Sequence, residues 1–321
     1  MTIVRQPTRA GIRDAAGKLA EILPRSPLYT HDMDGVAVAF KAECLQPIGA
    51  FKLRGAWHRL TAIDPKERTR GVVAFSSGNH AQGVAWAAKR LGMPAVIVMP
   101  SDAPKAKRDA TMALGAEVVS YDRATESREK IAAHLAHARG AALVPSFDDP
   151  WVIEGQGTVG LEVMSQMVER DLPDPAHFVV PCGGGGLSAG IALAVPEARV
   201  TVVEPAGWDD MRRSLEAGWI EPVGDDPPPT ACDALQTKQV SERTFNVLAK
   251  HDARGVAVTE SEIRAAQRWA AGRLRLVVEP GGAVALAALL SGRVAPEPGL
   301  VVVLSGGNVD IDAYARALAT E

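Results

Sequence analysis

The chain alternates between two patterns of apolar and polar positions. Short, nearly continuous apolar runs are followed by longer stretches in which apolar residues recur at helical spacing. The short runs predict strands over 71–75, 95–99, 117–120, 141–144, 178–181, 200–204 and 300–304. Strands that lack a polar face are typical of a parallel sheet covered on both faces by helices.

The longer stretches predict helices between these strands. Candidate helices cover 9–23, 81–91, 103–114 and 125–138, and a further one begins at Leu187. Pro24 and Gly115 are placed to end the first and third of these helices. Because 321 residues exceed one small core, the repeated strand–helix units predict an α/β protein with two doubly wound domains and mainly parallel sheets.

Composition narrows the range of partners. Charged residues make up 23% of the chain and the formal net charge is −3, so neither nucleic acid nor an anionic membrane surface is favoured. No apolar run approaches the length of a bilayer span. Small molecules are therefore the expected partners.

Cysteine use and the N-terminus bear on the compartment. Cys44, Cys182 and Cys232 are odd in number and lie outside any CxxC pattern, which favours unpaired thiols and argues against a structural zinc site. Residues 1–7 lack the apolar core of a signal peptide. Both observations predict a cytoplasmic protein.

Lys52 is the first candidate for chemistry. It lies in the string IGAFKLRGA, residues 48–56, just before a helical stretch. A lysine amine forms an imine with an aldehyde, and removal from water lowers its pKa and frees the nucleophile. A surface lysine beside Arg54 is the alternative for a lysine considered by itself.

A glycine-rich turn is the second candidate. Gly183, Gly184, Gly185 and Gly186 join a predicted strand to the helix that begins at Leu187. Such glycines let backbone amides approach a phosphate, and the helix N-terminus adds a favourable field. A dinucleotide-binding loop is the rival interpretation: its GxGxxG order fits poorly, although Glu204 stands near the distance expected for its acidic residue.

Two further polar turns follow predicted strands. Residues 76–83, SSGNHAQG, precede a helix whose free backbone N–H groups suit a carboxylate, and a plain helix cap would explain one of these residues but not the run. Ser305 begins the turn SGGN after the strand at 300–304. A simple Ser-Gly turn is the alternative there.

Taken in this order, Lys52, the tetraglycine turn and Ser305 resemble the fold-type II pyridoxal phosphate enzymes, specifically the serine/threonine dehydratase and serine racemase family. The resemblance runs from near residue 6 to the C-terminus. It implies a tryptophan synthase beta-like fold with pyridoxal 5'-phosphate in the cleft between two domains. It further implies a large domain of residues 1–52 plus 148–321, a smaller inserted domain of residues 53–147, and a homodimer.

The resemblance also assigns roles to individual residues. Lys52 would carry the cofactor as a Schiff base, Phe51 would lie against one face of the pyridine ring, and Ser305 would face the pyridine nitrogen. The phosphate would be held by Gly183, Gly184, Gly185, Gly186 and Leu187. The substrate carboxylate would be held by Ser76, Ser77, Gly78, Asn79 and His80, with Asn79 also bonding the phenolic oxygen of the cofactor. Ser77 would lie opposite Lys52, where serine racemases use a second acid/base.

The reaction that the resemblance implies is an ammonia-lyase reaction. A β-hydroxy amino acid, L-threonine or L-serine by default, would be converted to a 2-oxo acid and ammonia. Serine racemase and an ammonia-lyase for 3-hydroxyaspartate or another specialised hydroxy amino acid are the alternative enzymes. A nucleotide-binding α/β protein without a covalent cofactor is the alternative from a different class.

Glu204 and Asp210 raise the question of a metal. Hard oxygen ligands suit Mg²⁺ or Ca²⁺. The spacing resembles the divalent-cation site of serine racemases, which implies Glu204 and Asp210 as side-chain ligands and Trp208 as a ligand through its carbonyl. A solvated acidic loop is the alternative.

Two positions bear on substrate choice. Arg128 stands in a Ser-Arg-Glu setting similar to one near the cleft of serine racemases, although a surface arginine is the preferred interpretation. Ala234 stands where the family commonly has glycine after an aspartate close to the cofactor. The added methyl group could reshape the pocket for the substrate side chain.

Overall fold

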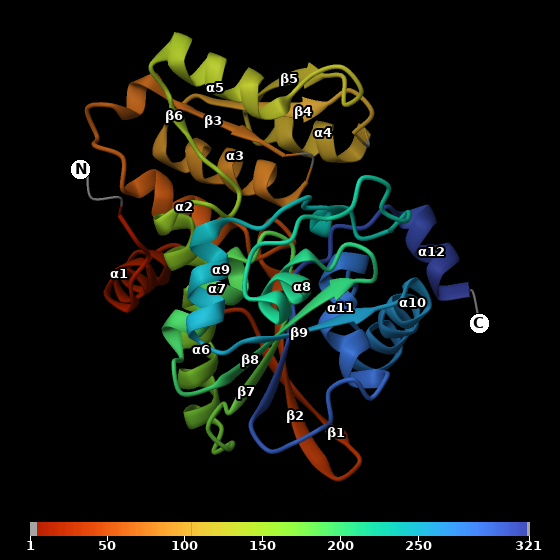
Figure 1. The fold of residues 1–321 in the computed structure, drawn as a ribbon. Helices are drawn as coiled ribbons and strands as arrows, with labels where there is room; N and C mark the ends of the chain where they lie inside the picture. Colours follow the sequence, from red (N-terminus) through yellow and green to blue (C-terminus); the bar gives the residue numbers. More distant parts are fainter. Residues whose placement is uncertain (1–4, 77, 104, 320–321) are drawn as a thin grey trace.

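Two sheets organise the chain, one above the other in the view of Figure 1. The computed structural model describes residues 5–319 apart from 77 and 104. Over these residues the larger sheet has the strand order β1-β2-β10-β7-β8-β9 and the smaller sheet β5-β4-β3-β6. The β1–β2 pair is antiparallel, whereas the other strand pairs of the described sheets are parallel. The predicted α/β class with mainly parallel sheets is confirmed.

Each predicted strand is present in one of the two sheets. The larger sheet contains β1 (Leu28–Met33), β2 (Val36–Ala42), β7 (His177–Pro181), β8 (Arg199–Pro205), β9 (Arg254–Val258) and β10 (Leu300–Leu304). The smaller sheet contains β3 (Val72–Phe75), β4 (Ala95–Pro100), β5 (Glu117–Tyr121) and β6 (Ala142–Leu143). Strands β1, β2 and β9 were not predicted. β1 and β9 carry polar or charged residues, whereas β2, VAVAFKA, is a largely apolar run whose pattern is typical of a strand.

Helices connect the strands and cover the sheets. They are α1 (Arg9–Ala20), α2 (Leu53–Thr61), α3 (Asn79–Leu91), α4 (Lys105–Ala113), α5 (Arg128–Arg139), α6 (Pro150–Glu169), α7 (Gly186–Ala194), α8 (Asp210–Ala217), α9 (Glu242–Lys250), α10 (Glu260–Trp269), α11 (Pro280–Leu290) and α12 (Ile311–Ala319). Where the pattern predicted a helix from residue 125, α5 begins at Arg128, because the Ser127 side chain caps it by accepting from the Lys130 N–H.

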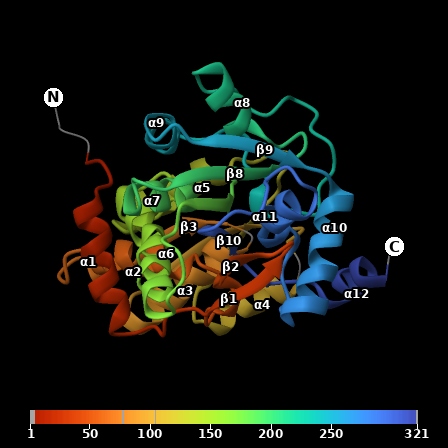
Figure 2. The same cartoon turned by 90° about the horizontal axis from the view of Figure 1, so that it is seen from below.

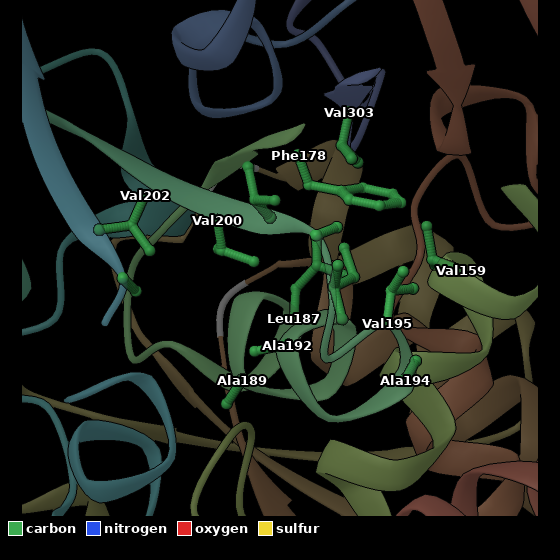
Figure 3. Packing of buried hydrophobic residues seen from close by; sticks show 14 of the residues in the cluster. Val159, Phe178, Leu187, Ala189, Ala192, Ala194, Val195, Val200, Val202 and Val303 are labelled. Atoms are coloured by element: carbon green, nitrogen blue, oxygen red, sulfur yellow. The ribbon is translucent and has the colours of Figure 1, made fainter. Parts of the chain in front are cut away.

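The strands of the larger sheet contribute alternate residues to two cores. Phe178 and Val180 pack with α6 and α7, whereas Val179, between them, packs with α11 on the opposite face. Figure 3 shows the first core, in which Leu187, Ala189 and other residues of α7 lie beneath Phe178 and Val200. The view from below in Figure 2 shows α6 and α11 on different sides of the strands. Burial of both faces explains why these strands are apolar without interruption.

The smaller sheet is built in the same way from residues 72–143. Val72 and Ala74 pack with α2 and α3, and Val73 packs with α5. Helix α2 also packs against α6, so it joins the two sheets. All strands of the smaller sheet lie within the segment 53–147, while the domain boundaries at 52/53 and 147/148 stay predictions. Among the helices described, none is both long enough and apolar enough to cross a membrane.

Candidate active site

A cavity of about 140 Å³ collects most of the residues that the sequence motifs predicted. Its lining includes the following residues from those motifs: Phe51, Lys52, Ser76, Gly78, Asn79, His80, Gly183, Gly184, Gly185, Gly186, Leu187 and Ser305. Ser77 lies outside the described residues. Glu204, Trp208 and Asp210 do not line this cavity.

The sheet topology explains why distant motifs meet. Ser76 follows β3, Gly183 follows β7 and Ser305 follows β10, each at the carboxyl end of a parallel strand. Ligands of open parallel sheets bind outside these ends. β7 and β10 belong to the larger sheet and β3 to the smaller one, so the carboxyl ends of both sheets meet at the same cavity. The cavity therefore lies where this class of fold places its ligand sites.

Lys52 is half-buried in the wall of the cavity. Its Nζ donates a hydrogen bond to the Ser146 carbonyl oxygen at 2.8 Å, and burial lowers the pKa of its amine to about 8. A Cβ atom built on Gly83 would lie 3.1 Å from the Lys52 carbonyl carbon, so glycine allows α3 to pack closely against the start of α2. A lowered pKa raises the neutral, nucleophilic fraction of the amine at neutral pH.

A buried ionic network fixes the helix that follows Lys52. The guanidinium of Arg54 donates to both oxygens of Glu43 at 2.8 Å and to both oxygens of Glu162 at 2.7 and 2.8 Å. Lys41 also donates to Glu162, at 2.8 Å. Bidentate pairs of this kind restrict orientation as well as position. Arg54 therefore holds the first turn of α2, two residues after Lys52, in one place.

The tetraglycine turn leaves its backbone accessible to a ligand. Gly185 has a φ of 83°, a left-handed conformation that favours glycine, and α7 begins at the next residue. A Cβ atom built on Gly184 would lie 2.2 Å from the Phe147 ring, so a side chain does not fit there. The N–H groups at the start of α7 have no partner within the helix and suit a phosphate.

The first two residues of α3 are held on both sides. Asn79 Nδ2 donates to Glu279 Oε1 at 2.6 Å, and Asn308 Nδ2 donates to Asn79 Oδ1 at 2.8 Å. The ring nitrogen Nε2 of His80 lies 2.9 Å from the Val144 carbonyl oxygen. Burial, together with the Lys52 charge, lowers the pKa of His80 to about 3. His80 is therefore neutral at pH 7 and brings no positive charge to the cavity.

Sequence reasoning missed part of the lining. Glu279 is the clearest case, a buried acid whose pKa is raised to about 7 by burial first and by the nearby Asp233 second. An acid directly before Pro280-Gly281-Gly282 and a strongly apolar helix was the signal that could have found it. Phe147, whose ring packs on the tetraglycine turn, and Ser146 carried no motif.

Cationic side chains also reach the cavity. Arg128 lines it with its Cζ 5.5 Å from the centre of the Phe75 ring, although 41% of its side chain stays exposed. Lys107 lines it as well and forms an ion pair with Asp233. Ala234, beside Asp233, is part of the same wall. This wall meets the tetraglycine turn, because a Cβ atom built on Gly183 would lie 3.4 Å from the Ala234 carbonyl oxygen.

Comparison with known proteins assigns this arrangement to a family. The protein family described as "Pyridoxal-phosphate dependent enzyme" matches residues 23–306. The chain belongs to this family. The resemblance inferred from Lys52, the tetraglycine turn and Ser305 is thereby confirmed, and pyridoxal phosphate is the cofactor of the family.

Three relatives illustrate the range of similar proteins. An L-threo-3-hydroxyaspartate ammonia-lyase from Pseudomonas sp is 42% identical, with 95% of this chain and 96% of that protein covered. A serine racemase from Schizosaccharomyces pombe is 37% identical, with 98% of each chain covered. A solved structure of threonine deaminase, from the organism abbreviated T.th., has a TM-score of 0.86 and 41% identity, and 95% of this chain and 99% of that chain are covered.

The cavity of this pyridoxal-phosphate dependent enzyme fits the cofactor chemically. The Lys52 amine, with its lowered pKa, can bond an aldehyde, and the glycine cradle at the start of α7 can accept a phosphate. The Ser305 hydroxyl, at the end of β10, offers a neutral partner rather than a carboxylate. The individual role of each residue stays a prediction.

The predicted metal ligands form a separate, buried acidic pair. Glu204 accepts hydrogen bonds from the Met211 and Arg212 N–H groups at 3.1 and 2.8 Å, and Asp210 Oδ2 accepts from the Val240 N–H at 2.8 Å. Asp210 Oδ1 is buried and has no hydrogen-bond partner. Burial raises the pKa of both acids, to about 7 for Asp210. Carboxylate oxygens are the ligands that Mg²⁺ and Ca²⁺ prefer, and the unpaired Oδ1 of Asp210 fits such an ion.

The rest of this site offers few additional ligands. Among the residues that the structure describes, no group of three or more His, Cys, Asp or Glu side chains could hold a metal ion. Trp208 donates its indole N–H to the Pro228 carbonyl oxygen at 2.8 Å and is nearly buried. The metal site therefore depends on two carboxylates and a backbone carbonyl, and it stays a prediction.

Proposed function

We propose that this enzyme is an ammonia-lyase that converts a β-hydroxy amino acid, L-threonine or L-serine by default, to a 2-oxo acid and ammonia. The observation that carries the proposal is the half-buried Lys52, whose amine has a lowered pKa, in one cavity with the tetraglycine turn, the start of α3 and Ser305. Relatives with this activity support it, since they cover nearly the whole chain.

The residues divide the work by their chemistry. When bound, pyridoxal phosphate supplies the electron sink that makes the Cα proton of the substrate acidic. The N–H groups at the start of α3 bind the substrate carboxylate, and those at the start of α7 bind the phosphate. The neutral form of Lys52, favoured by burial, removes the Cα proton and holds it at Nζ. The neutral Ser305 hydroxyl leaves the electron sink weaker than a carboxylate would, which favours elimination.

A panel of hydroxy amino acids tests this proposal. L-threonine, L-serine and L-threo-3-hydroxyaspartate are each incubated with the loaded enzyme, and 2-oxo acid and ammonia are measured together. We expect equal amounts of both products from at least one of the three. Release of neither product from any of them, with the cofactor bound, would contradict the proposal.

Two cationic side chains of the cavity besides Lys52 favour a dicarboxylic substrate as a second candidate. Lys107 and Arg128 both line the cavity, and the N–H groups at the start of α3 already offer donors to one carboxylate. A second carboxylate, as in 3-hydroxyaspartate, could replace Asp233 as the partner of Lys107 and pair with Arg128. The relatives named for that substrate support this candidate.

Substitution of each cation tests the dicarboxylate candidate. Arg128→Gln and Lys107→Gln should raise the KM for 3-hydroxyaspartate by about tenfold or more, since each removes one charge-assisted contact, and should change the KM for L-threonine much less. Lys105→Gln is the matched control, because Lys105 lies on the same helix as Lys107 and pairs with Asp109 outside the cavity. Equal losses for both substrates would contradict the candidate.

The proposal also includes a location, an oligomeric state and an alternative activity. A cytoplasmic location is supported by the three cysteines, which are all buried and unpaired. A homodimer is proposed from the family resemblance alone. A racemase activity depends on Ser77, which lies outside the described residues, and it stays the alternative activity.

A further inference from the structure

One acidic side chain of the cavity has no role in the proposed reaction. Glu279 immediately precedes α11, its side chain is buried, and it lines the cavity. Its Oε1 accepts the hydrogen bond from Asn79 Nδ2 at 2.6 Å, across 200 positions of sequence. Its backbone N–H donates to the Gly306 carbonyl oxygen at 3.0 Å, which ties it to the turn after Ser305. Glu279 is thus fixed between two motifs of the site.

Asn308 holds the opposite side of the same amide. Its Nδ2 donates to the Ile48 carbonyl oxygen and to Asn79 Oδ1, each at 2.8 Å. Both N–H bonds of the Asn308 amide are therefore used, and the group can present only a donor to Asn79. Gly49 lies against it: a Cβ atom built there would be 2.3 Å from Asn308 Oδ1. The orientation of Asn308 is set by the chain around Lys52.

These two partners allow one orientation of the Asn79 amide. Rotation by half a turn would bring the amide oxygen against the Glu279 carboxyl group and the amide N–H against the N–H of Asn308. In the observed orientation, one Nδ2 hydrogen is bonded to Glu279, and the other remains for a ligand in the cavity. Asn79 is also the first residue of α3, which packs on the smaller sheet. Glu279 stands directly before α11 and Asn308 follows β10, and both of these elements belong to the core of the larger sheet.

We propose that Glu279 is a positioning residue that, together with Asn308, fixes the Asn79 amide and the first turn of α3 against the wall of the cofactor cavity. Its effect on a bound cofactor passes through Asn79. Burial of Glu279 strengthens this hydrogen bond, since water cannot compete for either group. The inference goes beyond the proposed reaction, because it concerns how the cofactor is held and does not depend on which substrate is used.

The test compares Glu279→Ala, Glu279→Gln and Asn79→Ala. The absorbance spectrum of each loaded protein and the affinity of each apoprotein for pyridoxal phosphate are measured, so no substrate is involved. Glutamine keeps an acceptor oxygen, so Glu279→Gln should retain the parent spectrum and an affinity within about threefold. Glu279→Ala and Asn79→Ala should shift the spectrum in the same direction and weaken cofactor binding by about tenfold.

A double variant separates a positioning role from a general structural role. Glu279→Ala combined with Asn79→Ala should bind the cofactor no more weakly than Asn79→Ala alone, since Glu279 acts through Asn79. Additive losses, a parent-like Glu279→Ala, or a Glu279→Gln as impaired as Glu279→Ala would each overturn the inference. If Glu279→Ala does not fold, Asn308→Ala takes its place: a shift like that of Asn79→Ala supports the inference, and a parent-like spectrum overturns it.

Discussion

The residues of the site divide into those that a motif could reveal and those that only the fold brings together. Lys52, the tetraglycine turn and Asn79 could be found from the sequence, because a reactive amine, a phosphate cradle and a helix start each need specific residue types in a short run. The acid before Pro280 was a local signal for Glu279, but its contact with Asn79, 200 positions away, is not encoded by any local pattern. The Ser-Arg-Glu setting raised Arg128 as a candidate without deciding against a surface position, and Lys107 carried no motif; the cavity lining includes both.

The burial of His80 predicts how the free energy of unfolding depends on pH. Its pKa is about 3 in the folded protein, because burial first and the Lys52 charge second oppose protonation, whereas an unfolded histidine has a pKa of about 6.5. As the pH falls below about 6.5, the unfolded state takes up this proton first, so the free energy of unfolding decreases down to a pH of about 3. His80→Gln should reduce that decrease, since glutamine can still donate to the Val144 carbonyl oxygen.

Denaturant unfolding of the two apoproteins at pH 7 and about pH 4.5, between the two pKa values, measures this effect. The parent should lose more stability between the two pH values than His80→Gln does. Equal losses would show that His80 is protonated in the folded protein or plays no part in its acid sensitivity.

At the scale of elements, apolar runs predicted most of the buried strands, and the strands with polar residues, β1 and β9, were missed together with the apolar β2. Strands β3, β4, β7, β8 and β10 are mostly buried along their length, so their sequences are conspicuous. The hairpin β1–β2 was missed although its turn carries a signal: Asp34 and Gly35 both have positive φ, 54° and 83°, as a two-residue hairpin turn requires. Helix ends depended on caps such as Ser127, which a periodicity cannot show.

The connection from β8 to α8 carries the metal prediction. If Glu204 and Asp210 hold Mg²⁺ or Ca²⁺, chelation should lower the Tm by about 5 °C, because the ion neutralises two buried carboxylates and binds only the folded state. Adding back Mg²⁺, Ca²⁺ or Mn²⁺ should restore the Tm. The double variant Glu204→Ala/Asp210→Ala should not respond to chelator. If the Tm of the parent protein does not change with chelator and elemental analysis finds no ion, Glu204 and Asp210 are an acidic pair that holds no metal.

At the scale of the whole molecule, the family resemblance supplied what local patterns could not. The order of strands in the two sheets, and the meeting of Ser76, Gly183 and Ser305 at their carboxyl ends, depend on pairings between segments far apart in the sequence. The repeated strand–helix units indicated two such sheets but not which strands are neighbours. The cavity is a property of this assembly, and its chemistry depends on one amine.

The attachment of the cofactor to Lys52 tests that account most directly. The loaded protein is reduced with borohydride, digested, and mapped by mass spectrometry, with Lys107→Ala as the control because Lys107 lines the same cavity. We predict a reduced cofactor adduct on Lys52 in the parent and in Lys107→Ala, and no lysine adduct in a folded Lys52→Ala, which should also lack turnover. An adduct on another lysine in the parent, or a lysine adduct that persists in Lys52→Ala, would contradict the account.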